Sequence, residues 1–192
     1  MKTILFVAPH ADDETLGCDG TILKLVAQGH KIHWMLVTSM SKGGGFSQAQ
    51  IDERTEEIRI VAKNYGFAGV HELGFLPSAL DSLPKSQLIN SITPVISSIK
   101  PDQVYVPFRN DAHSDHEIVF DAVISSTKIF RYPNVKRILA YETLSETDFS
   151  LKPTNSSFKP NVFVNIEGFL DQKINIMKKF RSEMGEFPFP RS

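Results

Sequence analysis

The sequence predicts an α/β protein with a Rossmann-like, mostly parallel sheet and helices on both faces. Short runs of apolar, β-branched residues alternate with longer stretches of helical spacing, which is the pattern of a parallel sheet covered by helices. The chain of 192 residues is long enough to bury a continuous core, and its 41% hydrophobic and 22% charged residues are typical of a globular protein. We therefore expect a single α/β domain over residues 1–192.

The first elements follow from apolar runs and their boundaries. Residues 4–8 form an uninterrupted apolar run that predicts a buried strand. Residues 15–28 have helical spacing, and Gly29 is the residue type that ends helices. Residues 31–38 predict the second strand.

The middle of the chain repeats this alternation. Ser47 followed by Gln50 resembles a capping box, which predicts the start of a helix over residues 47–65. Residues 70–75 predict a third strand, and residues 86–100 predict a helix that contains one proline.

The rest of the chain adds three strands and two helices. Residues 103–107, 137–142 and 161–166 are the expected strands, and residues 114–130 and 168–184 are the expected helices. The chain thus predicts six strands in all.

Composition excludes several classes of protein. The formal net charge of -1 and pI of about 6.6 give no basic excess for nucleic-acid binding. The apolar run at residues 3–9 is too short for a signal peptide core or a membrane span. One cysteine allows no internal disulfide and fits a reducing compartment. We expect a cytoplasmic protein with no nucleic-acid partner and no membrane span.

Two polar clusters follow expected strands directly. Residues 9–14 read PHADDE after the first strand, and residues 110–116 read NDAHSDH after the fourth. In an open parallel sheet, ligands bind beyond the carboxyl ends of the strands, where the strand order reverses. The active site is therefore expected at the C-terminal ends of strands one and four, with the two clusters facing each other.

These residue types suit a catalytic metal centre. Three ligands drawn from His and Asp leave a fourth coordination position open, as in catalytic zinc sites, although Fe2+, Co2+ and Mn2+ accept the same donors. A water molecule held there would have its pKa lowered towards about 7. The alternative is structural: an acidic helix cap at residues 12–14 and a solvated helix start at residues 113–116.

The same clusters carry a family resemblance. Residues 9–14 resemble the P/A-H-x-D-D-E signature of the PIG-L/LmbE-like de-N-acetylases, and residues 111–116 resemble that family's second signature, H-x-D-H. Arg54 and Glu57 match a common R-x-x-E pattern. Residues 158–166 and 188–192 look like further family segments.

The resemblance implies the reaction and the metal ligands. The family hydrolyses the N-acetyl group of a glucosamine-like sugar, releasing acetate and a free amine. Carried over to this chain, it implies that His10, Asp13 and His116 bind a metal ion such as Zn2+, and that Asp12 is the general base. The implied partner is an N-acetylated sugar or glycoconjugate.

Four further residues are assigned with their alternatives. The resemblance implies that His113 polarises the acetyl carbonyl or protonates the departing amine, and that Asp115 orients its ring. Arg54 is a candidate for binding a substrate hydroxyl or phosphate, or else forms a surface pair with Glu57. Asp111 hydrogen-bonds a ligand histidine or the substrate, or else only forms a turn.

The other histidines and the C-terminus complete the prediction. His30, His33 and His71 lie in or beside strand-like segments without carboxylate clusters, and we interpret them as structural. Family members usually continue beyond the segment that ends here at Ser192, so the chain is either naturally short or truncated. The sequence leaves homo-oligomer formation open.

Two other functions stay open alongside the de-N-acetylase. One is a metal-dependent esterase or phosphohydrolase. The other is a sugar-binding protein that retains the metal site without turnover. Asp12 and His113 argue against a pure binder, which needs no base beside the metal.

Overall fold

The computed structural model describes residues 1–150 and 157–189. Five strands form one parallel sheet in the order β3-β2-β1-β4-β5, with every neighbouring pair parallel. The strands are β1 (Thr3–Ala8), β2 (Lys31–Thr38), β3 (Gly69–Phe75), β4 (Gln103–Pro107) and β5 (Arg137–Tyr141). The predicted Rossmann-like parallel sheet is confirmed.

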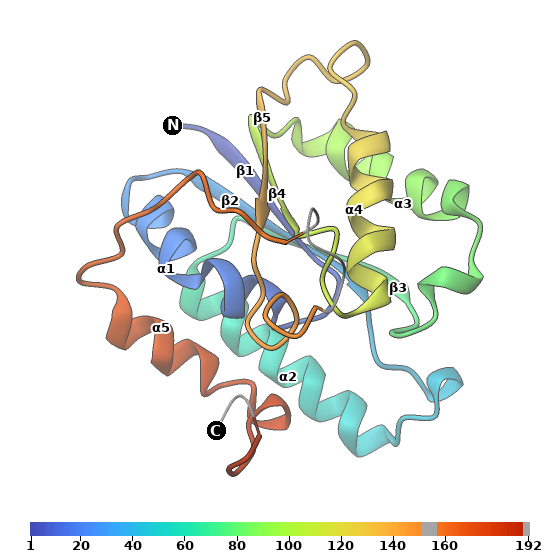
Figure 1. Cartoon of the computed structure of the whole chain (residues 1–192), viewed down its shortest axis with the longest axis vertical. Helices are drawn as coiled ribbons and strands as arrows, with labels where there is room; N and C mark the ends of the chain where they lie inside the picture. Colours follow the sequence, from blue (N-terminus) through green and yellow to red (C-terminus); the bar gives the residue numbers. More distant parts are fainter. Residues whose placement is uncertain (151–156, 190–192) are drawn as a thin grey trace.

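Helices cover both faces of this sheet (Figure 1). One face carries α1 (Asp13–Ala27), α2 (Gln48–Tyr65) and α5 (Leu170–Met177), and the other carries α3 (Lys85–Ile99) and α4 (Ser114–Ser126). Each face has its own apolar core, and β1 contributes alternate residues to both. Burial on both faces explains why β1 reads as a continuous apolar run.

Local signals in the sequence are confirmed at several element ends. Ser47 and Gln50 form the capping box at the start of α2. Gly29 adopts a left-handed φ of 78° just after α1, which glycine does without steric cost. The helix expected to reach residue 130 ends earlier, at Ser126.

The sixth predicted strand is wrong. Within residues 157–166, which the structure describes, no residue joins the sheet. The segment packs on α1 instead, because Gly20 leaves room for Ile166: a Cβ atom at position 20 would lie 2.7 Å from that side chain. The Lys24 ammonium also donates to the Asn165 carbonyl at 2.8 Å.

The last predicted helix is shorter than expected. α5 ends at Met177, and a 3-10 turn follows at Arg181–Glu183. The turn is stabilised by tertiary contacts, since Ser182 donates from its backbone N–H and its hydroxyl to the two carboxylate oxygens of Glu57 on α2. Residues 190–192 of the expected terminal family segment lie outside the described residues.

The strand order indicates where a ligand would bind, at the C-terminal ends of β1 and β4. β1 and β4 are neighbours, and the strand order runs outward from them in opposite directions. That reversal is the point where ligands bind in doubly wound sheets. In the part of the chain that the structure describes, no helix has the length and apolar character needed to cross a bilayer.

Candidate metal centre

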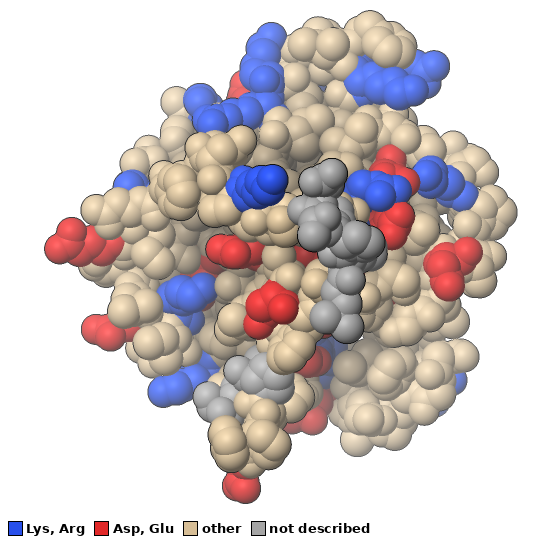
Figure 2. All heavy atoms as spheres, viewed as in Figure 1, with Lys and Arg blue, Asp and Glu red and all other residues tan. Residues whose placement is uncertain are grey.

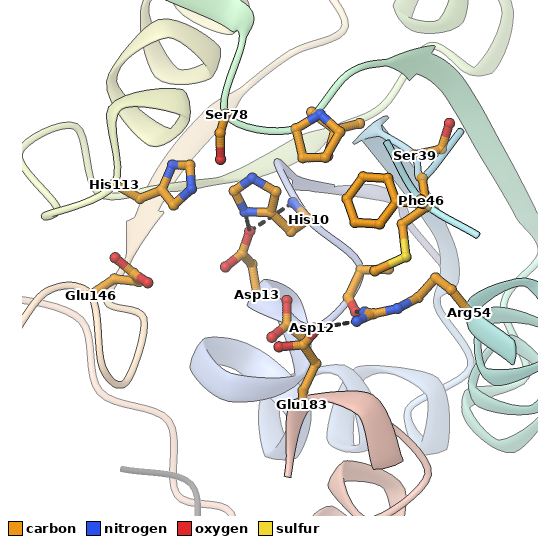
Figure 3. Close-up of a pocket in the computed structure, with 14 residues that line it drawn as sticks. His10, Asp12, Asp13, Ser39, Phe46, Arg54, Ser78, His113, Glu146 and Glu183 are labelled. Carbon is orange, nitrogen blue, oxygen red and sulfur yellow. Dashed lines mark hydrogen bonds and ion pairs between the residues drawn. The ribbon is translucent and has the colours of Figure 1, made fainter. Parts of the chain in front are cut away.

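The loops after β1 and β4 meet beside a cavity of about 230 Å³. Its wall also includes residues that follow β2 and β3, Arg54 of α2, and Glu183 near the C-terminus. Figure 3 shows His10 between His113 and Arg54, with Asp12 below it near Asp13 and Glu183. The two polar clusters therefore meet at the C-terminal ends of strands one and four, as the topology predicts.

Three side chains converge as a ligand set would. One donor atom from each of His10, Asp13 and His116 lies within 4.8 Å of the other two. His10 Nδ1 is 3.3 Å from Asp13 Oδ2, and His116 Nε2 is 3.3 Å from Asp13 Oδ1. Ligand atoms about 2.1 Å from a tetrahedral zinc ion stand about 3.4 Å apart, so these spacings suit coordination.

The remaining nitrogen of each ligand histidine contacts a carboxylate. His10 Nε2 lies 3.0 Å from Asp115 Oδ2, and His116 Nδ1 lies 2.7 Å from Asp111 Oδ2. The Thr147 hydroxyl donates to the other oxygen of Asp111 at 2.7 Å. Carboxylates in this position fix the tautomer and orientation of metal-binding histidines.

Charge is concentrated and buried at this cluster. Burial alone would lower the pKa of His10, but hydrogen bonds to Asp115 and Asp13 outweigh it and raise that pKa to about 9. Burial likewise opposes protonation of His116, whereas the neighbouring Asp13 and Asp111 raise its pKa to about 10. Burial would raise the pKa of Asp13, but the adjacent His116 and His10 charges hold it well below its usual range. The cluster thus keeps a carboxylate ionised beside two cations.

A divalent cation fits this donor set. His116 Nε2 is buried, and among the described residues it makes no hydrogen bond of good geometry, only the ion-pair contact of 3.3 Å with Asp13 Oδ1. A metal ion between these two atoms would satisfy both of them. A second triad, His10 with His113 and Asp115, also has close donor atoms, but the Asp115 carboxylate and His113 Nδ1 are already hydrogen-bonded.

Asp115 contacts a different histidine from the one expected. Its carboxylate reaches His10 and accepts the backbone N–H groups of Ser78 at 2.7 Å and Leu80 at 3.3 Å. Its link to His113 runs through its own backbone N–H, which donates to His113 Nδ1 at 3.1 Å. The expected carboxylate contact to the His113 ring is therefore replaced by a main-chain contact, because two loop amides and His10 take up the carboxylate.

His113 is held as a neutral donor. Burial and the adjacent His10 charge lower the pKa of His113 below its ordinary value. Because Nδ1 accepts the Asp115 N–H, a neutral ring carries its proton on Nε2. His113 lines the cavity, so its arrangement suits hydrogen-bond donation to a bound acyl oxygen.

Asp12 is the first residue before α1, but its side chain makes no cap hydrogen bond to that helix. The helix-cap interpretation of this cluster therefore does not explain Asp12. Its carboxylate borders the cavity next to Asp13 (Figure 3). This placement lets Asp12 accept a proton from a molecule bound there.

Arg54 is buried rather than on the surface. Its guanidinium donates to the Ala11 carbonyl at 2.7 Å and to the Ser182 hydroxyl at 2.9 Å, and it pairs with Glu183. Glu57 lies 3.4 Å from its Nε. The guanidinium is thus engaged mainly by protein atoms, and it positions the loop after β1 and the C-terminal turn.

Asp111 does not border the cavity, since it is buried against His116 and Thr147. Of the alternatives for Asp111, the geometry supports the contact with a ligand histidine and not direct substrate binding.

Sequence reasoning missed several residues of the site. Glu146 and Glu183 line the cavity, Thr147 supports Asp111, and Ser78 supports Asp115 with an unusual positive φ of 57°. They come from loops far from the two motifs, and isolated Ser, Thr or Glu residues give no spacing signal. A local signal near them is Pro77, directly before Ser78, because proline is common in loops.

A doubly wound parallel sheet with a His/Asp cluster at its switch point defines an α/β protein with a hydrolytic type of site. Residues 5–127 match the PIG-L family, described as GlcNAc-PI de-N-acetylase, and the chain belongs to this family. It is accordingly a member of a deacetylase enzyme family.

Individual relatives agree with this assignment. A diacetylchitobiose deacetylase of Thermococcus kodakarensis is 26% identical over 194 residues, covering 97% of this chain and 72% of that protein. An uncharacterized deacetylase of Escherichia coli K12, YaiS, is 28% identical over 187 residues, covering 94% and 91% of the two chains. Among solved structures, the conserved protein TT1542 from Thermus thermophilus superposes with a TM-score of 0.77 at 25% identity, covering 96% and 80%.

Proposed function

We propose that this chain is a metal-dependent hydrolase that removes the N-acetyl group from an N-acetylglucosamine-like sugar. The observation that carries the proposal is the convergence of His10, Asp13 and His116 beside a cavity that Asp12 and His113 also line. Family membership and the relative named for diacetylchitobiose support the acetamide and the sugar.

The donor set selects the cofactor class. Two imidazoles and one carboxylate, without a thiolate, suit Zn2+ and also admit Fe2+, Co2+ or Mn2+. A divalent ion held by these residues would supply Lewis-acid chemistry, polarising the acetyl carbonyl and making water acidic. Asp111 and Asp115 would fix the ligand rings from behind.

Asp12 and His113 have different roles in the reaction. Asp12 accepts the proton of the attacking water, and the neutral His113 donates a hydrogen bond from Nε2 to the developing oxyanion. The amine leaves as the carbon–nitrogen bond breaks, and it takes up the proton that Asp12 received. Acetate and a free amino sugar are the products.

The cavity favours one sugar ring. Its volume of about 230 Å³ is below the roughly 300–1,000 Å³ of pockets for drug-sized ligands. A single N-acetylated ring therefore fits, with the rest of a larger substrate outside. Glu146 and Glu183 at the wall offer carboxylates that can accept hydrogen bonds from sugar hydroxyls.

Charge argues against the phosphohydrolase alternative. Figure 2 shows acidic side chains both near the centre and at the margins of one face, with lysines and arginines spread among them, so that face as a whole favours neither sign of charge. Among the described residues, the cavity wall contains one arginine, Arg54, and that guanidinium is engaged by Ala11, Ser182 and Glu183. A phosphate dianion would meet mainly carboxylates.

Acetate release from N,N'-diacetylchitobiose and N-acetylglucosamine tests the proposal. Release should stop after treatment with a chelator and return on addition of Zn2+ or Co2+. His10→Ala should abolish it, whereas His30→Ala, outside the site, should not. Full activity in chelator, or in His10→Ala, would rule the mechanism out. A protein that binds these sugars and metal without releasing acetate would support the sugar-binding alternative.

A further inference from the structure

A second pair of histidines lies outside the cavity, on the edge strand β3 and its neighbour β2. His33 of β2 and His71 of β3 approach within 3.1 Å, from Nδ1 of the first to Nε2 of the second, with ring centroids 5.3 Å apart. Strand register pairs His33 with Gly69 and Met35 with His71, so both rings project from the same sheet face. Both side chains are only partly buried, so solvent ions can reach them.

A glycine between the rings makes this approach possible. Gly69 lies beside His33 and two residues before His71 on the same face. A Cβ atom at position 69 would lie 2.8 Å from His33 Nδ1 and 3.3 Å from His71 Nε2. Any other residue would therefore occupy the space where the two nitrogens converge.

The spacing of the two nitrogens fits coordination of one ion. Two imidazole nitrogens, each about 2.05 Å from a metal ion and 3.1 Å apart, subtend an angle of about 100° at that ion. This angle lies between those of adjacent ligands in square-planar and tetrahedral complexes. We propose that His33 and His71 form a second site, for a divalent transition-metal ion of the imidazole-binding class.

Both rings are in the form that binds metal. Burial lowers the pKa of His71, and burial together with His71 and Lys31 lowers the pKa of His33, so both are neutral near pH 7. One proton now lies between the two nitrogens. When the ion binds, that proton moves through solvent to the other nitrogen of its own ring, so no net charge has to be removed.

The site differs from the candidate metal centre in position and strength. Each histidine is the third residue of its strand, near the amino ends and away from the carboxyl ends where His10 lies. Two imidazoles without a carboxylate, next to the positive Lys31, make a weaker site that water completes. By the general affinity order, Cu2+ should bind most tightly, ahead of Ni2+ and Zn2+.

Copper binding by the full chain tests this site by difference. Titration calorimetry with CuCl2 should show one Cu2+ ion more per chain in the wild type than in His71→Gln, whatever the candidate metal centre binds. His33→Gln should lose the same ion, because removing one of two linked ligands weakens binding by on the order of tenfold or more. Gly69→Ala should weaken it as well, by forcing the rings apart.

His30→Gln is the matched control, since His30 is a partly buried histidine three residues before His33 whose Nδ1 accepts the Lys2 N–H. It should bind as much Cu2+ as the wild type. Electron paramagnetic resonance should show two coupled nitrogens for the additional ion, and circular dichroism should show that the variants stay folded. Equal copper binding by the wild type, folded His71→Gln and folded His33→Gln would overturn the proposal.

Discussion

The two groups of histidines differ in their neighbours more than in their own geometry. At the carboxyl ends of β1 and β4, His10 and His116 each contact two carboxylates, and their pKa values rise to about 9 and about 10. On β2 and β3, His33 and His71 contact each other, and their pKa values fall.

This difference in neighbours leads us to expect different functions for the two groups of histidines. In the proposed mechanism, carboxylates around the first pair would add a third ligand, fix the rings and provide Asp12 as a base, so that site would both hold an ion and move a proton. The rings of the second pair hydrogen-bond to each other, and neither of them lines the cavity. We expect the first site to catalyse and the second only to bind.

The largest expected effect tests whether the carboxylates at the first site do more than balance charge. Asp12→Asn keeps the shape of the side chain but removes the base. We expect kcat for acetate release to fall by about 10²–10⁴-fold, while Zn2+ binding is retained. Asp52→Asn, at an exposed carboxylate on α2, is the control and should leave kcat unchanged. A near-normal kcat in Asp12→Asn would assign the base elsewhere.

The next effect, on the free energy of unfolding, concerns Arg54, a buried cation next to carboxylates. Arg54→Gln would leave Glu57 buried without its charge partner. We expect the free energy of unfolding to fall by about 3 kcal/mol, measured by urea denaturation. Arg59→Gln, at an exposed position on the same helix that pairs with Glu56, should cause no measurable change. Unaltered stability in Arg54→Gln would mean that the guanidinium network contributes little, and that Arg54 serves the substrate instead.

A smaller effect, on Zn2+ affinity, tests whether Asp111 orients His116. Asp111→Asn retains a hydrogen-bond acceptor for His116 but removes the charge. We expect Zn2+ affinity to fall by about 10–100-fold, measured by competition with a fluorescent chelator. Thr147→Val, which removes only the hydroxyl that supports Asp111, should weaken binding less. A reversed order of these two variants would contradict the assignment of Asp111 as the residue that orients His116.

The sequence was sufficient for the fold class, for five of the strands and for the meeting of the two polar clusters. Five strands and their parallel order follow from apolar runs and helical spacing, and residues 9–14 and 110–116 follow strands whose neighbours are fixed by the topology. Prediction failed where tertiary contacts override local preference. Residues 161–166 have strand composition but pack on α1 through Gly20.

Long-range partners of the site were not predictable in the same way. Asp115 contacts His10 because the amides of Ser78 and Leu80 orient its carboxylate from a third loop. Arg54 was expected either to bind the substrate or to form a surface pair with Glu57, whereas Ser182 and Glu183 cover it from the other end of the chain. Nothing in local spacing encodes contacts over such separations.

The smallest effect is the pH dependence of stability, which should have opposite signs at the two histidine groups. His33 and His71 have folded pKa values below the ordinary 6.5, so the unfolded chain binds more protons as the pH falls through 6.5, and stability is lost on the acid side. In the metal-free protein, His10 and His116 have raised values, so their contribution is complete below 6.5 and is lost as the pH rises through about 9 and about 10. Urea denaturation in chelator, from about pH 5 to about pH 10, measures both slopes. His71→Gln should flatten only the acid side and His116→Gln only the alkaline side, and a variant that flattens the opposite side would show that neighbouring carboxylates do not set this difference.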